Sequence, residues 1–255
     1  MQLGLKLWST NHHYFDEACR LWNDGFYDYI ELTAVTGSYE HSASLWKSLD
    51  VPYVIHGPTY GQGFSLAHKE REDENMQRMA EVQKFADLLN APLIILHPGV
   101  EGDLSECARQ LNLISDPRIA IENKPYVVTG GLVCNGYLPE HLAFLKEQSN
   151  IKICFDVGHA FCAANSLKKS PLPFIKRFIE LKPDIYHLMD GHKDGIYDIH
   201  LNLGKGDFDF EEILPLYPED CLITLETDKN FEDTLVDFEE DVNFLRGVLS
   251  NAHAL

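Results

Sequence analysis

The segment Tyr186–Phe210 is dense in side chains that could bind a metal ion. Neutral imidazole and carboxylate groups suit zinc, manganese or iron, and an Asp-x-His pair on an extended segment points both side chains to one face. Glycines interrupt the segment, and its pattern leaves almost no positions for a continuous apolar face that could pack in the core. A polar loop that happens to be rich in histidine would have the same composition, so partners elsewhere must decide. The candidate ligands of the segment are His187, Asp190, His192, Asp194, Asp198, His200 and Asp207.

Eight short apolar runs alternate with helix-period segments, which is the pattern of consecutive βαβ units in a parallel sheet. The length of 255 residues is close to that of one eight-fold β/α barrel. We therefore predict an α/β fold, a (β/α)8 TIM barrel that forms a single domain over residues 1–255. Helices are expected at Tyr14–Asn23, His68–Leu89 and Phe231–Leu249, among others. The predicted strands are Leu3–Trp8, Tyr27–Leu32, Tyr53–His56, Leu93–His97, Ile119–Glu122, Ile151–Asp156, Ile185–Leu188 and Leu222–Glu226.

Metal-ligand residue types stand where the later strands run out into loops, which is where barrel enzymes place their catalytic groups. One further residue follows strand six by three positions, and two more lie in the loop after strand seven. All nine are expected to converge on one mouth of the barrel. They are His56, His97, Glu122, Asp156, His159, His187, Asp198, His200 and Glu226.

Each of these residues has an ordinary structural explanation when it is taken singly. A histidine after an apolar strand is often only hydrogen-bonded, and a lone glutamate can serve an ion pair. Jointly, four buried carboxylates and five imidazoles would repel or desolvate one another without cations. The set therefore predicts a metal centre. The histidines that lack this setting are expected to be structural: His12, His13, His41, His68, His141, His192 and His253.

Composition narrows the class of protein. The formal net charge of −19 argues against a broad nucleic-acid footprint, which draws on many Lys and Arg contacts to phosphate. The six cysteines are scattered without CxxC spacing, so neither a disulfide framework nor a cysteine zinc site is indicated. The chain opens without a leader pattern and has no apolar run of spanning length. We expect a cytoplasmic protein with no membrane partner.

The strand-end series resembles the xylose isomerase-like TIM-barrel superfamily, and within it the endonuclease IV family (AP endonuclease family 2). Members of that family hold three zinc ions and hydrolyse DNA phosphodiesters at abasic sites. The resemblance implies a first metal held by His56, His97 and Glu122, and a second held by Glu122, Asp156, His187 and Glu226. It implies a third metal held by His159, Asp198 and His200. Glu122, which would bridge and orient two of the ions, and Glu226 are the implied catalytic residues.

The same superfamily includes sugar isomerases and epimerases that use one Mn²⁺ or similar ion in a Glu, Asp, His, Glu quartet. Glu122, Asp156, His187 and Glu226 match that quartet, and in those enzymes the two glutamates also move protons beside a carbonyl. The quartet alone does not separate the two chemistries. The third set, with Asp198-x-His200, favours the hydrolase. A metal-binding or sugar-binding barrel without catalytic activity is a further class.

The chain departs from the endonuclease pattern in its first two βα loops, LKLWSTNHH and IELTAVTGSYEH, which lack the basic and aromatic cluster of a duplex-opening loop. A DNA substrate is therefore disfavoured. Trp8 and Tyr60, with Tyr39 and Phe64, could stack on a substrate ring. Four lysines follow predicted strand ends and could supply positive charge at the mouth: Lys124, Lys193, Lys205 and Lys229.

The sequence therefore predicts a metal-dependent phosphoester hydrolase with up to three zinc ions. Manganese or another divalent ion is the alternative cofactor. The expected partner is a small phosphoester or sugar, and the alternative reaction is sugar isomerisation or epimerisation.

Overall fold

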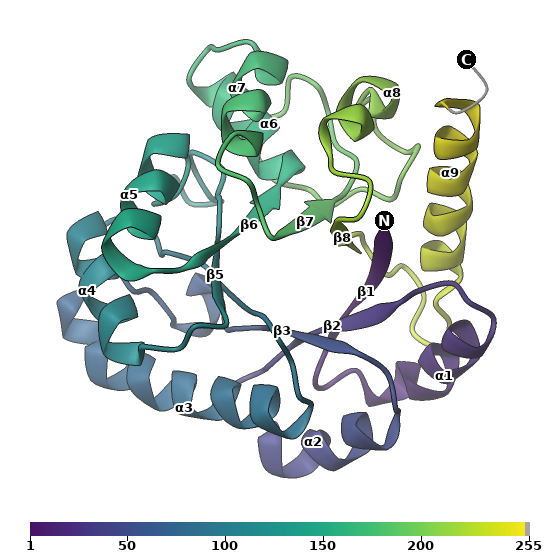
Figure 1. Cartoon of the computed structure of the whole chain (residues 1–255), viewed down its shortest axis with the longest axis horizontal. Coiled ribbons are helices and arrows are strands. Elements are labelled where there is room, and N and C mark those ends of the chain that lie inside the picture. Colours follow the sequence, from purple (N-terminus) through teal and green to yellow (C-terminus); the bar gives the residue numbers. More distant parts are fainter. Residues whose placement is uncertain (253–255) are drawn as a thin grey trace.

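The computed structural model describes the backbone of residues 1–252 and the side chains of residues 1–250. Eight parallel strands pair in chain order, and β1 also pairs with β8, which closes the sheet into a barrel (Figure 1). The predicted TIM barrel is confirmed. The strands are β1 Gln2–Trp8, β2 Tyr29–Thr33, β3 Tyr53–His56, β4 Ile94–Leu96, β5 Ile119–Glu122, β6 Lys152–Asp156, β7 Ile185–Leu188 and β8 Leu222–Leu225.

The helices form a ring outside the barrel (Figure 1). Local sequence signals mark where the helices start. Pro139 and Pro171 occupy first helical positions, where the backbone N–H that proline lacks would have no partner within the helix. Asp103 and Asp156 cap helices by accepting backbone N–H groups. The helices are α1 Phe15–Asn23, α2 Tyr39–Ser48, α3 Glu72–Leu88, α4 Leu104–Ile114, α5 Pro139–Ser149, α6 Val157–Ser166, α7 Pro171–Ile179, α8 Phe210–Ile213 and α9 Val236–Ala252.

Element ends differ from the predictions by a few residues. His97 and Glu226 are the first residues after β4 and β8 rather than the last strand residues. The helix predicted from His68 starts at Glu72, because Lys69–Arg71 form a 3-10 turn before it. The last helix starts at Val236 rather than at Phe231. These shifts leave every candidate ligand at the end of the barrel where the strands run out.

The buried apolar residues form two clusters, one inside the barrel and one between the barrel and the helices. The larger cluster joins the outward strand faces to the surrounding helices. The smaller cluster takes alternate residues from β2 to β8 and fills the interior. Tyr29, at its β1 side, lies against Gly4, where a larger side chain would collide with the tyrosine ring. Six residues make up the strand part of the small cluster: Tyr29, Val54, Ile95, Ala120, Cys154 and Ile185.

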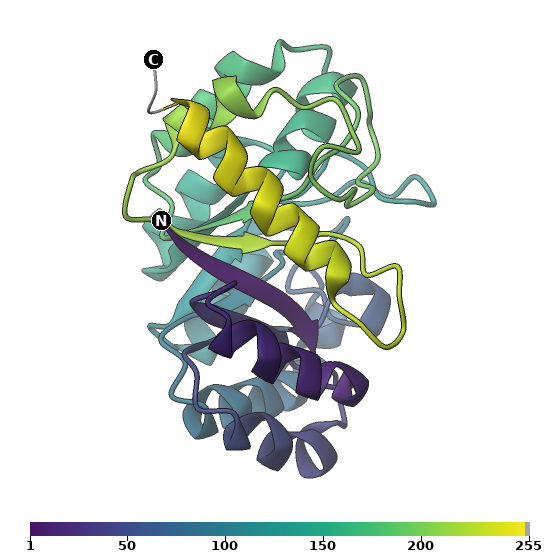
Figure 2. The same cartoon turned by 90° about the vertical axis from the view of Figure 1, so that its right-hand side faces the viewer.

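The last helix lies across the part of the wall where the barrel closes. Figure 2 shows α9 passing in front of the end of β8, with β1 running beside it. Its buried side chains Phe238, Val242 and Leu245 belong to the larger cluster. None of the described helices combines the length and apolar character needed to cross a membrane.

Candidate metal centre

Strand alternation places the candidate ligands. Side chains two residues apart on a strand point to the same face. Glu122 lies two residues after the interior residue Ala120, and Asp156 lies two residues after Cys154. The same step leads from Ile185 to His187. These three candidate ligands therefore form the uppermost layer of the barrel interior, directly above the smaller apolar cluster.

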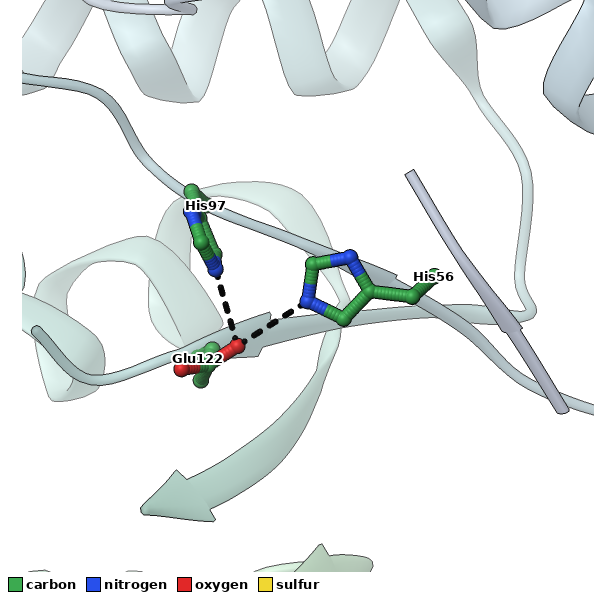
Figure 3. A group of neighbouring side chains, drawn as sticks. All are labelled: His56, His97 and Glu122. Carbon is green, nitrogen blue, oxygen red and sulfur yellow. Dashed lines mark hydrogen bonds and ion pairs between the residues drawn. The ribbon is translucent and has the colours of Figure 1, made fainter. Parts of the chain in front are cut away.

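The first group joins β3, β4 and β5. Oε2 of Glu122 lies 3.2 Å from Nε2 of His56 and 3.0 Å from Nε2 of His97 (Figure 3). Nδ1 of His56 donates to the carbonyl of Gly57 at 2.7 Å, so in the neutral ring Nε2 keeps its lone pair. These three residues bring together one donor atom each within 4.8 Å of one another, as a metal site requires.

The second group shares Glu122 with the first. Donor atoms of Glu122, Asp156, His187 and Glu226 lie within 4.8 Å of one another. Nδ1 of His187 is 2.6 Å from Oε2 of Glu226 and 3.9 Å from Oδ2 of Asp156. His187 and Asp156 are fully buried. The quartet predicted from the sequence is thus assembled at the centre of the barrel mouth.

The third group is formed by α6 and by the loop after β7. Oδ2 of Asp198 lies 3.1 Å from Nε2 of His159 and 2.6 Å from Nε2 of His200. The Nδ1 atoms of the two histidines donate to backbone carbonyls, those of Asn123 at 2.9 Å and Glu226 at 2.8 Å. Both Nε2 atoms therefore face the carboxylate. All nine predicted ligands fall into these three groups.

Asp190 organises the loop that carries the third group. Its carboxylate accepts backbone N–H groups at 2.8–3.1 Å, with Oδ1 bound to Gly191 and Phe208 and Oδ2 bound to Gly204 and Gly206. The expectation that this segment lacks a core face was wrong, because Leu203, Phe208 and Phe210 are buried. Within the described residues, three further members of the segment join no metal group: His192, Asp194 and Asp207.

Four buried donor atoms of the centre have no hydrogen-bond partner among the described residues. A buried polar atom without a partner is costly, and such atoms need an explanation. The four atoms come from the second and third groups. Two of them, Nδ1 of His187 and Oε2 of Glu226, face each other at 2.6 Å but form no hydrogen bond, and a divalent cation would supply a partner for each of the four. The donor set of imidazole nitrogen and carboxylate oxygen therefore fits zinc or a similar ion. The atoms are Oδ2 of Asp156, Nδ1 of His187, Oδ1 of Asp198 and Oε2 of Glu226.

The charges of the centre are strongly perturbed. Burial raises the pKa of Asp156 to about 6. Burial, helped by the nearby Lys124 ammonium, lowers the pKa of His97 to about 3, so this ring stays neutral. Burial also acts to lower the pKa of His159, but the carboxylates of Asp156 and Asp198 outweigh it and raise this pKa to about 10. Without a cation, the centre binds protons at positions where a metal would need lone pairs.

Two buried residues of the site were not predicted from the sequence. Lys6 of β1 lies 2.5 Å from Oε1 of Glu31 and 3.4 Å from Oε1 of Glu226. Glu31 of β2 is fully buried, and its Oε2 lies 3.0 Å from Nε2 of His187. The available signal was a single charged residue inside each of two apolar strands, LGLKLW and YIELT. Burial of such a charge requires a partner, so each residue indicated the other.

Cys154 is a further donor that the sequence did not indicate. Its thiol lies within reach of Glu122 and His187, below the quartet. Burial raises the pKa of this thiol to about 12, so the thiol is protonated when no metal is bound. We assign the second group to the three carboxylates and His187, the four residues that match the quartet expected from the sequence.

Two cavities flank the centre. A cavity of about 390 Å³ lies beside Glu226 and His200, and Lys6, Trp8 and Lys229 line it. A cavity of about 310 Å³ lies beside His97, and Tyr60 and Lys124 line it. Four of the five predicted substrate residues thus border the metal groups on two sides.

Other predicted surface residues lie apart from these cavities. Lys205 is exposed and lines neither of them. Phe64 is fully buried, so it cannot stack on a substrate. Tyr39 packs edge-on against Phe85, with ring centroids 5.0 Å apart. These aromatic side chains serve packing instead.

The remaining histidines in the described residues join no metal group. His12 bonds to Ser42 at 2.8 Å, and His68 bonds to the carbonyl of Val100 at 2.9 Å. His141 accepts the N–H of Gly136 at 3.2 Å. Contacts of this kind match their predicted structural role. His253 lies outside the described residues.

Known proteins share the fold of this chain, and some of them bind zinc. The uncharacterized protein MJ1614 of Methanocaldococcus jannaschii is 25% identical over 179 residues, which cover 65% of this chain and 66% of that protein. The chain thus spans about two thirds of the length of this curated relative. Among similar solved structures, one from Thermus thermophilus was soaked with zinc chloride and another holds a bound zinc atom.

Two solved structures represent the two chemistries. A D-tagatose 3-epimerase-like protein aligns with 100% of this chain and 99% of its own, at 20% identity and a TM-score of 0.75. Endonuclease IV of Thermus thermophilus aligns with 99% of this chain and 100% of its own, at 19% identity and a TM-score of 0.69. At these identities the likeness shows the fold alone. The family model for the xylose isomerase-like TIM barrel matches residues 25–246, and the chain belongs to this family.

Proposed function

We propose that the protein is a metal-dependent phosphoester hydrolase that binds up to three divalent ions, with zinc as the first candidate. The observation that carries the proposal is the third group, His159, Asp198 and His200, assembled beside a complete quartet. A one-metal isomerase has no need of this additional group. Similar structures include endonuclease IV, whose name supports this class of reaction.

Each group of residues has a task in this proposal. His56, His97 and Glu122 would hold one ion, the quartet a second and the third group a third. Bound divalent ions supply Lewis-acid stabilisation of phosphoryl oxygens. Glu122 belongs to two groups and orients both, which makes it the residue on which the geometry depends most. Glu226 contacts His187 and Lys6, and it lies at the edge of the 390 Å³ cavity, where a substrate enters.

The cavity beside Glu226 suits an anionic substrate. Lys229 lines it, and burial lowers the pKa of this lysine to about 8, so most of it is cationic near neutral pH. Trp8 is 49% exposed at the same cavity and offers a flat apolar face. A small phosphoester with a ring or apolar group would meet both. A long duplex would meet few further cations on a chain with 21 basic and 40 acidic residues.

The test uses Asp198→Ala with Asp194→Ala as matched control, because Asp194 is an exposed acid of the same loop that joins no metal group. Zinc per chain is measured by elemental analysis, and hydrolysis is measured with an aryl phosphodiester. We expect Asp198→Ala to lose one ion and more than about a hundredfold of the hydrolytic rate, because even outer-shell changes cost 10–100-fold. Full hydrolysis by the Asp198→Ala protein would overturn the proposal.

A sugar isomerase or epimerase is the second candidate. The quartet is complete without the other two groups, and the D-tagatose 3-epimerase-like protein shares the fold. In that reaction Glu122 and Glu226 would move protons on carbon atoms beside a carbonyl. Isomerisation of ketose sugars that survives in Asp198→Ala but not in Glu122→Ala would favour this candidate.

A further inference from the structure

The ammonium group of Lys124 lies inside the candidate metal centre. Its Nζ atom is 3.2 Å from Nε2 of His97 and 3.1 Å from Nε2 of His159. It is also 3.4 Å from Oε1 of Glu122. These contacts join the first group to the third. The lysine therefore stands where two of the three metal groups meet, rather than on the rim of the barrel.

A rigid segment holds Lys124 in this place. The preceding residue, Asn123, exchanges two hydrogen bonds with the backbone of Asp156, at 2.7 and 2.8 Å, and so locks the end of β5 to the end of β6. The N–H of Lys124 donates to the carbonyl of Gly136 at 3.3 Å. Only 11% of the lysine side chain is exposed. The ammonium is thus held by its surroundings and is not a mobile surface charge.

The position of the ammonium conflicts with full metal loading. Nε2 is the atom through which His97 and His159 would bind a metal, because Nδ1 of His159 is engaged by a backbone carbonyl and His97 directs Nε2 at Glu122. An ammonium that donates to the neutral His97 ring occupies the lone pair of its Nε2 atom, and its positive charge repels a cation at the Nε2 atoms of both histidines. Of the quartet, Lys124 contacts only Glu122, which the first group shares; among the described residues it makes no hydrogen bond or ion pair with Asp156, His187 or Glu226.

We infer that Lys124 is a tethered cation that sets the order of metal binding: its ammonium stands in for ions of the first and third groups and leaves the quartet open. This inference rests on the metal-dependent function proposed above. The first ion then binds at the quartet. Loading of the other two groups requires the ammonium to withdraw towards the 310 Å³ cavity that Lys124 lines, where it can meet the substrate.

The test compares Lys124→Met with Lys193→Met. Methionine keeps the apolar stem and removes the charge, whereas Lys193 is an exposed lysine of the loop after β7 whose loss changes the net charge equally. Chelator-treated proteins are titrated with zinc near neutral pH by calorimetry, and zinc per chain is measured after dialysis. Melting temperatures are measured with chelator and with zinc.

We expect one tight zinc ion and weaker further ions in the unaltered protein and in Lys193→Met. In Lys124→Met the further ions should bind at least about tenfold more tightly, because a positive charge a few ångströms away has been removed. The same variant should melt lower than the unaltered protein in chelator, since four carboxylates lose a counter-charge, and should gain more from zinc. A lysine with a purely structural role would give only the lower melting temperature in chelator, without the larger gain from zinc.

Equal zinc stoichiometry and affinity in the unaltered protein and in Lys124→Met would overturn the role of Lys124 and leave the metal-dependent function standing. Absence of zinc binding in both proteins would overturn both. If Lys124→Met does not fold in chelator, Lys124→Gln keeps a neutral hydrogen-bonding group at the site, and the same stoichiometry and affinity measurements apply to it.

Discussion

Nε2 of His187 lies 3.0 Å from Oε2 of Glu31, and both side chains are completely buried. The same oxygen accepts the hydroxyl of Thr224 at 2.6 Å, while Oε1 of Glu31 pairs with Lys6 at 2.5 Å. The carboxylate thus fixes which imidazole nitrogen of His187 is engaged and turns Nδ1 towards Glu226. A carboxylate behind a histidine in this way orients metal ligands and raises their basicity.

Replacement of Glu31 by glutamine should therefore weaken metal binding at the quartet, although Glu31 belongs to no metal group itself. We expect zinc affinity to fall by about 10–100-fold, as is usual for groups behind a ligand. The free energy of unfolding should fall by about 3–5 kcal/mol, because buried Lys6 loses its ionic partner. Zinc calorimetry and denaturant unfolding measure the two effects. Glu40→Gln, an exposed position on α2, is the control, and equal zinc affinity in both variants would contradict the orienting role.

Asp190 should stabilise the loop of the third group without binding metal. Replacement by alanine would leave four backbone N–H groups of that loop without an acceptor, and each buried unpaired group costs about 1–3 kcal/mol. We expect the free energy of unfolding to fall by about 3 kcal/mol or more and hydrogen exchange to rise across residues 198–207. Asp194→Ala should change neither quantity. Unaltered exchange in Asp190→Ala would show that the loop is held by its buried apolar side chains instead.

The convergence of the nine candidate ligands could be predicted because barrel closure brings the ends of successive strands to one mouth. His56, Glu122, Asp156 and His187 each end an apolar strand, and strand alternation then points them to the interior side. Asp198 and His200 lie outside any strand; the Asp-x-His pattern in the loop after β7 placed them at the mouth, and only their grouping with His159 came from the resemblance to a family. The structure supports that placement through contacts with His159.

Other features could not be predicted because they depend on three-dimensional neighbours. Lys6 and Glu31 sit on strands β1 and β2, far from His187 in the chain, and only barrel closure brings them together. Lys124 follows a strand like the other lysines, but its inward direction depends on how Asn123 locks onto β6. The role of Asp190 depends on the loop folding back, so that the N–H groups of Gly204 and Gly206 reach its carboxylate. Composition alone made this residue look like a ligand.

The stability of the metal-free protein should fall as the pH rises above neutral. The folded-state pKa of His159 is raised from 6.5 to about 10, mainly by Asp156 and Asp198 against the opposing effect of burial, and that of His200 is raised to about 9. A raised pKa gives stability that is fully present below the ordinary value and is lost as the pH passes the folded value. The melting temperature in chelator should therefore decline between about pH 6.5 and 10.

Zinc should remove this decline, because a bound ion replaces the protons of the third group. Apparent zinc affinity should rise over the same pH range, with proton release on binding. Melting curves in chelator and in zinc, measured across the range, give the comparison. His159→Gln should flatten the decline in chelator. A decline that is equally steep with zinc, or unaltered in His159→Gln, would show that other groups govern it.

The final prediction concerns the substrate. The candidate metal groups favour phosphoester hydrolysis, whereas the net negative charge disfavours binding of a DNA duplex. A protein that reads a duplex releases counterions from several phosphates and loses affinity steeply with salt, whereas a site that holds one phosphate shows a shallow dependence. This chain has a net charge of −19, and the two cavities beside the metal groups offer mainly Lys6, Lys124 and Lys229 as cations. We expect weak, salt-sensitive duplex binding and preferred hydrolysis of a small or single-stranded phosphoester.

Cleavage of an abasic-site duplex, a short single strand and a small aryl phosphodiester should be compared at low and physiological salt, beside isomerisation of ketose sugars. Lys229→Met and Trp8→Ala should raise KM for the small phosphoester several-fold with little change in kcat, because these residues border the cavity and belong to none of the metal groups. Lys205→Met should change neither constant, since Lys205 lies outside both cavities. Efficient incision of the abasic duplex at physiological salt would mean that the short first and second βα loops suffice to open DNA, and the small-substrate prediction would be wrong.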